Sequence, residues 1–316
     1  MRASKSKDPD RRYNYLVGVP FERTVVARGI RSRTTSPHIL DAVLWWHLLS
    51  LDAPTVAAVW TWFIGRTAHV SLPWTAPAAM FLGVWILYAS DRLLDARAEK
   101  AASQTPTQLE ARHHFHGAHR NAFFVAIAIA AAALLPMLIT MPRHTLALYC
   151  LLGVLQIAWF VLIHRVARGE SSRLPKEFAV GIFFAAAVFL PTVSRMPSLR
   201  LSLLPAAAAF ACLCSLNCIF IFAWEHRELQ GASSAHRTTR LALRFLEPIA
   251  LSLTLLPIVL ALVTRSMPWQ VAAALSLASA LLLVLDRLER VLGQVRLRAI
   301  ADLVLLTPLL VIAFWP

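Results

Sequence analysis

The chain has 316 residues, of which 58% are apolar and only 15% charged, and its formal net charge is +14. Soluble globular domains contain fewer apolar and more charged residues, so this composition excludes an ordinary water-soluble fold and indicates an integral membrane protein. Nucleic-acid-binding proteins are also strongly basic, but the positions of the basic residues, described below, argue against nucleic acid as a partner.

The N-terminal stretch Met1–Pro37 is polar and carries nine Lys or Arg residues. We predict that it is a mobile basic tail in the cytosol, and that residues 38–316 form a single transmembrane domain. The run His38–Leu51 is too short to cross a membrane and contains aromatic residues suited to the lipid interface. We therefore expect it to be a helix lying on the cytosolic face.

Apolar runs of about the length needed to cross a hydrocarbon core as a helix then recur almost to the C-terminus. They predict an all-α polytopic bundle of nine transmembrane helices. The expected spans are Pro54–Val70, Trp74–Leu93, Ala122–Thr140, Thr145–His164, Phe178–Val193, Leu203–Ala223, Pro248–Val263, Trp269–Leu285 and Ile300–Trp315.

The distribution of basic residues predicts the orientation of this bundle. With a cytosolic N-terminus, all but five of the 31 Lys and Arg residues lie in the tail and in the loops on the cytosolic side. Cytosolic loops are enriched in these residues, so we expect the N-terminus inside, the C-terminus outside, and the cell (inner) membrane as the location. The basic excess also favours contact with anionic membrane lipids.

Acidic residues stand where the first two spans meet the cytosolic side. Asp52 precedes Pro54 and suits the start of a helix; it is also a candidate substrate-binding residue, because a carboxylate at a membrane entrance is costly without a partner. The second span ends in Asp91-Arg92-Leu93-Leu94-Asp95, whose two aspartates share one helical face. They are either solvated flanks or part of a site with a nearby cation.

Three cytosolic segments supply the remaining candidates. The segment Ala98–Arg120 contains His113, His114, His116 and His119, which are either solvent-facing or ligands of a transition metal. The segment His164–Lys176 offers donors to phosphate oxygens, from Arg165, Arg168 and Lys176. The sixth span holds Asn217, a candidate for a helix-helix hydrogen bond, and leads into Glu225, His226, Arg227 and Glu228.

These motifs resemble those of the UbiA superfamily of membrane prenyltransferases. Leu51-Asp52-Ala53-Pro54 is similar to the family's Asp-x-Pro at its first helix, and Asp91-Arg92-Leu93-Leu94-Asp95 to the end of its N-D-x-x-D-x-x-x-D motif. Leu174-Pro175 with Val180-Gly181 is similar to the segment opening its fifth helix, and Phe222–Glu228 lies where its second aspartate motif falls. Leu87 and Tyr88 replace the family's Asn and first Asp.

The resemblance implies Mg²⁺-dependent transfer of a prenyl group from a prenyl diphosphate to an aromatic or lipid acceptor within the membrane. Mg²⁺ prefers oxygen ligands, so the expected catalytic and metal-binding residues are Asp91, Asp95, Glu225 and Glu228. The expected substrate-binding residues are Asp52, Arg92, Arg165, Arg168, Lys176, Asn217 and Arg227.

Two alternatives remain open from the sequence. The first is a non-catalytic scaffold or lipid-binding protein of UbiA-like fold with a degenerate metal site, which the loss of acidic residues at Leu87 and Tyr88 favours. The second is a metal enzyme acting on lipids with histidine ligands, built from His113, His116 and His226. The acceptor, the prenyl chain length and the oligomeric state are left open.

Overall fold

A computed structural model describes residues 37–102, 111–166, 176–226, 237–264, 267–292 and 294–314. The chain divides into two compact units, residues 1–42 and 43–316, and the account below concerns the second unit. The predicted tail, Met1–Pro37, lies outside the described residues except for its last residue.

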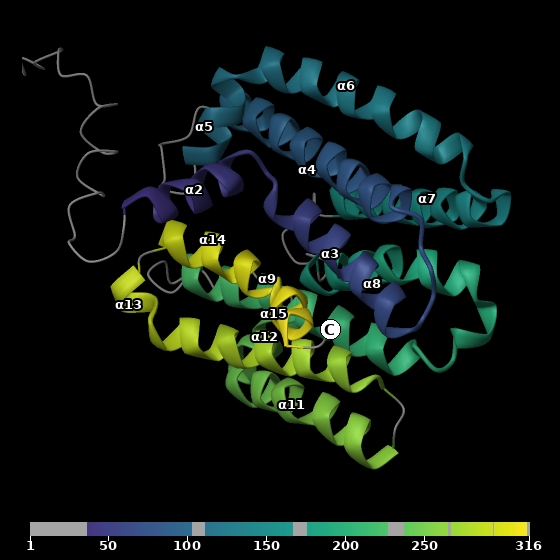
Figure 1. Ribbon diagram of the computed structural model, residues 1–316. Coiled ribbons are helices and arrows are strands. Elements are labelled where there is room, and N and C mark those ends of the chain that lie inside the picture. The colour runs from purple at the N-terminus through teal and green to yellow at the C-terminus, as the bar shows by residue number, and fades with distance from the viewer. Residues whose placement is uncertain are drawn as a thin grey trace, which may run out of the picture. The chain divides into compact units, whose positions relative to one another are not determined.

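The described part of the chain is helical throughout (Figure 1). Its elements are α2 (Pro37–Leu48), α3 (Asp52–Thr67), α4 (Thr75–Ala102), α5 (Ala111–Ala118), α6 (Arg120–Ile139), α7 (Arg143–Val166), α8 (Lys176–Arg195), η2 (Pro197–Leu199), α9 (Leu204–His226), α10 (Arg237–Arg244), α11 (Leu246–Val259), the π-helical η4 (Leu260–Thr264), α12 (Trp269–Arg287), α13 (Glu289–Leu292), α14 (Gln294–Val304) and α15 (Thr307–Ala313).

Eight of the nine expected spans coincide with helices, and the seventh runs from α11 into η4. The ninth, Ile300–Trp315, is not one continuous helix: α14 ends at Val304 and α15 begins at Thr307. Pro308 lies in the first turn of α15, where the backbone N–H that proline lacks would have no partner within that helix. The same missing N–H and the proline ring prevent α14 from continuing into α15 as one helix. The prediction of a continuous ninth helix is therefore wrong.

Several of these helices have the length and composition of membrane spans. In the part of the chain that the structure describes, five helices pass this test (α6, α8, α9, α11 and α12), and a sixth span is formed if the bent pair Ala42–Leu48 and Asp52–Thr67 counts as one. These apolar helices indicate a membrane protein.

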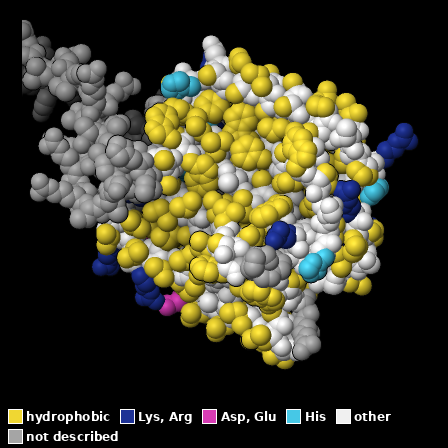
Figure 2. All heavy atoms as spheres, in the orientation of Figure 1, with side chains coloured by type: hydrophobic (Ala, Val, Ile, Leu, Met, Phe, Trp, Pro, Cys, Tyr) yellow, Lys and Arg dark blue, Asp and Glu magenta, His cyan; other side chains and the backbone are white. Residues whose placement is uncertain are grey.

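The outer helices expose apolar side chains in a way that lipid explains and water does not. The apolar stretch of α6 is only 11% buried and that of α11 only 22%, and Val125, Ile129 and Ile139 on α6 are each at least 60% exposed. Hydrophobic side chains cover most of the face drawn in Figure 2. A soluble monomer rarely exposes an apolar surface of this extent.

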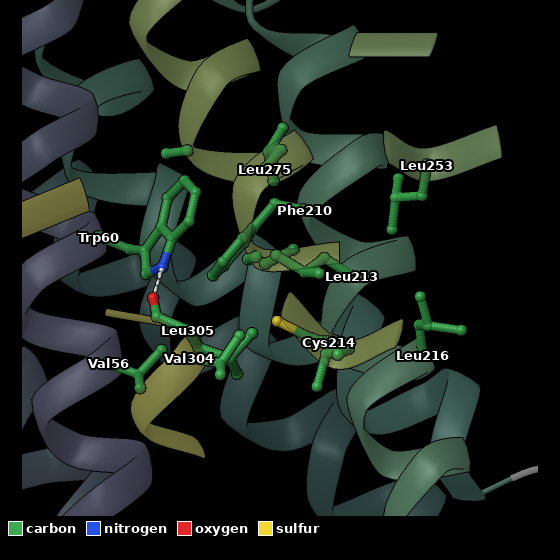
Figure 3. Packing of buried hydrophobic residues seen from close by; sticks show 14 of the residues in the cluster. Val56, Trp60, Phe210, Leu213, Cys214, Leu216, Leu253, Leu275, Val304 and Leu305 are labelled. Carbon is green, nitrogen blue, oxygen red and sulfur yellow. Dashed lines mark hydrogen bonds between the residues drawn. The ribbon is translucent and has the colours of Figure 1, made fainter. Parts of the chain in front are cut away.

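Helix α9 lies at the centre of the second unit, in contact with α8, α11, α12 and α14. Its inward residues Phe210 and Leu213 are fully buried and pack in one cluster with Leu275 of α12 and Trp60 of α3 (Figure 3). The Trp60 indole Nε1 donates a hydrogen bond of 2.8 Å to the carbonyl oxygen of Leu305, in the turn between α14 and α15. This bond ties the break in the last helical segment to α3.

The Trp60 bond gives a first testable prediction. Trp60→Phe is expected to destabilise the protein by about 1–3 kcal/mol, because the buried Leu305 carbonyl loses this donor and a small cavity remains. The thermal midpoint of the detergent-purified protein measures this effect. Trp74→Phe is the control, since Trp74 is 74% exposed; equal midpoints for the two variants would contradict the prediction.

Candidate functional site

The site begins at a sharp corner between α2 and α3, whose adjoining segments Ala42–Leu48 and Asp52–Thr67 cross at 93°. Ser50 turns the chain with a φ of 55°, a left-handed conformation that residues other than glycine seldom adopt. Two longer-range contacts fix the corner: the Trp85 indole of α4 donates to the Leu49 carbonyl at 3.1 Å, and the Ser50 hydroxyl lies 3.3 Å from His116 Nε2. Strained backbone of this kind often accompanies functional sites.

At this corner, two buried ionisable side chains are in contact. His47 Nδ1, near the end of α2, lies 2.7 Å from Asp52 Oδ2, at the start of α3. The other carboxylate oxygen, Oδ1, accepts a hydrogen bond of 3.0 Å from the Ala53 backbone N–H. Both oxygens of Asp52 are therefore oriented by neighbouring groups, and a carboxylate in the first turn also favours the helix dipole.

A second carboxylate reaches the same place from far along the chain. Helix α14 packs against α3 and α9 and carries Asp302, whose Oδ1 accepts a hydrogen bond of 2.9 Å from Asn217 Nδ2 on α9. Ligand atoms of His47, Asp52 and Asp302 all lie within 4.8 Å of one another. We call the four residues His47, Asp52, Asn217 and Asp302 the inner polar cluster.

Two arginines add positive charge beside this cluster. Arg298, one turn before Asp302 on α14, forms an ion pair with Glu225 at the end of α9. Burial lowers the pKa of the Arg298 guanidinium from its usual value, the Glu225 carboxylate opposes that shift, and the positive charge of Arg92 on α4 adds to it. The charges of Arg92, Asp52 and Asp302 therefore all act on the Arg298 guanidinium.

Asp91, the first aspartate of the predicted motif on α4, does not belong to the inner polar cluster. Asp91 is exposed, whereas Tyr88 and Arg92, four residues apart, are half-buried, and Tyr88 packs on the core. Residues four apart share a helical face, and the residue next to one of them points about 100° away. The structure thus turns Tyr88 and Arg92 inward at this level of α4, and Asp91 faces outward.

The other predicted residues divide into three groups. Asp52 and Asn217 belong to the inner polar cluster, Glu225 is held by Arg298, and His116 is fully buried beside Ser50 and stacks on Phe123 with ring centroids 4.1 Å apart. Helical residues whose side chains lie outside the described part are Asp95, His113, His114, Arg165, Lys176 and His226. Residues wholly outside it are Arg168, Arg227 and Glu228.

Sequence reasoning missed three members of the site: His47, Arg298 and Asp302. One signal was available, because an ionisable residue inside an apolar segment is a site candidate by default, and Asp302 lies within the expected ninth span. His47 also lies in an apolar run, five residues before Asp52, but a bent chain is needed to bring these two side chains together.

The comparisons with family models, with curated proteins and with solved structures found no match to this chain.

Proposed function

We propose that the chain is a multi-pass prenyltransferase that binds a prenyl diphosphate beside the inner polar cluster, through Arg92 and Arg298, and transfers the prenyl group to a lipophilic acceptor. One observation carries this proposal: the positive charges of Arg92 on α4 and Arg298 on α14 act on each other beside the inner polar cluster, although both belong to apolar helices far apart in sequence. Guanidinium groups match the oxygens of a diphosphate, and a prenyl chain matches the apolar space between helices.

The convergence of elements supports the same proposal. The start of α3, the latter part of α4 and the middle of α9 each carry a residue that the resemblance implies for substrate binding: Asp52, Arg92 and Asn217. Asp52 and Asn217 belong to the inner polar cluster, and the charge of Arg92 acts on Arg298 beside it. Since these residues are far apart in sequence, their proximity depends on how the helices pack.

Of the four magnesium ligands expected from the sequence, Asp91 and Glu225 fit this arrangement poorly, and the side chains of Asp95 and Glu228 lie outside the described part. Among the described residues, the one group of three potential ligands is His47, Asp52 and Asp302, and neither Asp91 nor Glu225 belongs to it. Asp91 is exposed and Glu225 is paired with Arg298. The proposal therefore contains no step through Mg²⁺ on those residues.

The proposed chemistry needs one bond to break and one to form. The bond between the allylic carbon and the diphosphate oxygen breaks, and its electron pair leaves with the diphosphate. A nucleophilic carbon or oxygen of the acceptor then bonds to the allylic carbon and loses a proton, which the released diphosphate accepts. Arg92 and Arg298 would stabilise the charge that grows on the leaving group, and the surrounding helices would keep water from the allylic cation.

The proposal includes a location and an orientation. The cell (inner) membrane, with the N-terminus inside, is supported by the asymmetry of Lys and Arg along the sequence. The inner polar cluster would then open toward the cytosol, where water-soluble diphosphate esters are made available.

Binding of farnesyl diphosphate to the detergent-purified protein tests this function. We expect it to raise the thermal midpoint more than farnesol does, and to be followed by diphosphate release once an acceptor is present. Arg92→Gln is expected to weaken binding roughly tenfold to a hundredfold, because one charge-assisted contact to the diphosphate is lost. Arg200→Gln is the control, since Arg200 is exposed and lies in a loop expected on the other side.

The two ligands separate the proposal from its alternatives. Equal stabilisation by farnesol and farnesyl diphosphate would identify a binder of apolar chains without a diphosphate site, as in the non-catalytic scaffold. Unchanged affinity in Arg92→Gln would contradict the role of Arg92 in diphosphate binding.

A further inference from the structure

The inner polar cluster has the composition of a metal site that differs from the one expected on sequence grounds. We infer that His47, Asp52 and Asp302 bind a divalent transition-metal ion, with Asn217 as a fourth contact at its edge. This inference does not depend on prenyl transfer, because it concerns only the donor atoms of the cluster and the charge they require.

The spacing of the donor atoms suits a shared ion. Donors held about 2.1 Å from one metal ion lie about 3.0–3.4 Å apart in common geometries, and about 4.2 Å apart at most. His47 Nδ1 and Asp52 Oδ2 are 2.7 Å apart, and all three ligand atoms lie within 4.8 Å of one another. Movements of less than an ångström would bring the three donors onto one coordination sphere.

The charge of the cluster also calls for a cation. Asp52 is buried, Asp302 is half-buried, and two carboxylates this close repel each other unless a proton or a cation lies with them. The nearby Arg298 shares its positive charge with Glu225, so it offsets the two carboxylates only in part. The His47 imidazole neutralises at most one of the two carboxylates, and only when it is protonated.

An independent observation comes from Asn217, which is 4% exposed. Its amide nitrogen donates to Asp302, but its buried oxygen Oδ1 has no hydrogen-bond partner among the described residues. A buried carbonyl without a partner costs about 1–3 kcal/mol. The amide is held on the cluster by its nitrogen, so an ion there, or a water molecule bound to that ion, would satisfy the oxygen.

The surroundings of the ligands resemble the outer shell of a metal site. Asp52 Oδ1 is fixed by the Ala53 N–H, and the corner that carries His47 and Asp52 is held by Ser50 in its left-handed conformation, by Trp85 and by His116. Outer contacts of this kind orient metal ligands and preserve their geometry.

The donor set decides the class of metal. One imidazole with two carboxylates suits Zn²⁺, Mn²⁺ or Fe²⁺, whereas Mg²⁺ and Ca²⁺ prefer oxygen ligands alone. Three protein ligands also leave positions for water or a substrate oxygen, as in catalytic zinc sites.

The test uses the full chain, purified in detergent, stripped with chelator and titrated with Zn²⁺, Mn²⁺ or Mg²⁺ without any prenyl substrate. We expect about one Zn²⁺ or Mn²⁺ per chain, a higher thermal midpoint on binding, and little response to Mg²⁺. His47→Gln and Asp302→Asn should each weaken binding by a hundredfold or more. The matched controls are His144→Gln and Asp286→Asn, since His144 contacts the Ser194 carbonyl and Asp286 accepts from Trp224.

A measurement on the unaltered chain keeps the inference falsifiable even if a variant fails to fold. Pulsed electron paramagnetic resonance of bound Mn²⁺ should show coupling to one imidazole nitrogen. No saturable binding of Zn²⁺ or Mn²⁺, absence of that nitrogen coupling, or equal affinity in the site and control variants would overturn the metal site. Since no prenyl diphosphate is present, such a result would leave the proposed function to be judged by its own test.

Discussion

Gly181→Ala is expected to be among the most damaging single substitutions in this chain, lowering the free energy of unfolding by about 3 kcal/mol or preventing accumulation of the folded protein. Gly181 lies in α8 where it packs on α9. A Cβ atom at this position would lie 2.2 Å from Ser215 Oγ and 2.4 Å from the Ala211 carbonyl oxygen. The carbonyl belongs to the α9 backbone, so only a separation of the two helices makes room.

The chain contains controls for this prediction. Gly83 of α4 and Gly153 of α7 are also helical, but a Cβ at either position would meet nothing within 4 Å. Gly83→Ala and Gly153→Ala are therefore expected to be neutral or stabilising by up to about 1 kcal/mol, because alanine has the higher helix propensity. Thermal midpoints and yields in detergent measure the three variants, and similar values for all of them would contradict close α8–α9 packing.

Arg298→Gln is expected to produce the second large effect, a loss of about 2–3 kcal/mol in stability. The Arg298 and Glu225 side chains are only 21% and 17% exposed, so removal of one partner leaves a largely buried charge without compensation. Breaking a fully buried pair costs about 3–5 kcal/mol, and partial access to solvent reduces that figure. The thermal midpoint of the purified variant measures the loss.

A double substitution and a second ion pair make this prediction specific. Arg298→Gln combined with Glu225→Gln should recover part of the stability, because the uncompensated carboxylate is gone. Arg287 and Glu247 also form an ion pair, but they are 70% and 59% exposed, so Arg287→Gln should change stability by at most about 0.5 kcal/mol. Equal losses in Arg298→Gln and Arg287→Gln would show that burial does not decide the effect.

Arg298 has two roles that a functional test of its variants would not separate. It stabilises the fold through Glu225 and lies beside the proposed diphosphate site, so a loss of activity in Arg298→Gln would have two causes. Arg92 is the better probe of diphosphate binding, and His47 and Asp302 are the better probes of metal binding. Testing each with its own ligand separates the two proposals.

The sequence determined which segments are helical and apolar. Span length and composition are local properties, and a segment of membrane length has to satisfy its backbone hydrogen bonds internally, which favours helix. Eight expected spans therefore coincide with helices, from α3 to α12. The prediction of one continuous ninth helix was wrong because Pro308 interrupts the helix, although the apolar composition of the segment continues across the break.

The residues of the candidate site were only partly predictable. Asp52 and Asn217 were identified as polar groups at or within spans, and the structure places both in the inner polar cluster. Asp91 was selected from the motif at the end of the second span, yet at this level α4 turns Tyr88 and Arg92 inward and leaves Asp91 exposed. A sequence pattern shows which residues share a helical face, but not which face meets the neighbouring helices.

What only the tertiary structure decided is the meeting of His47, Asp52 and Asp302. His47 and Asp52 come together because Ser50 bends the chain into a corner. Asp302 lies beside them because α14 packs against both α3 and α9. In the sequence, Asp302 comes 250 positions after Asp52. Local sequence sets the composition and length of each helix, whereas contacts between distant helices, which depend on the packing of the whole bundle, set the chemistry of the site.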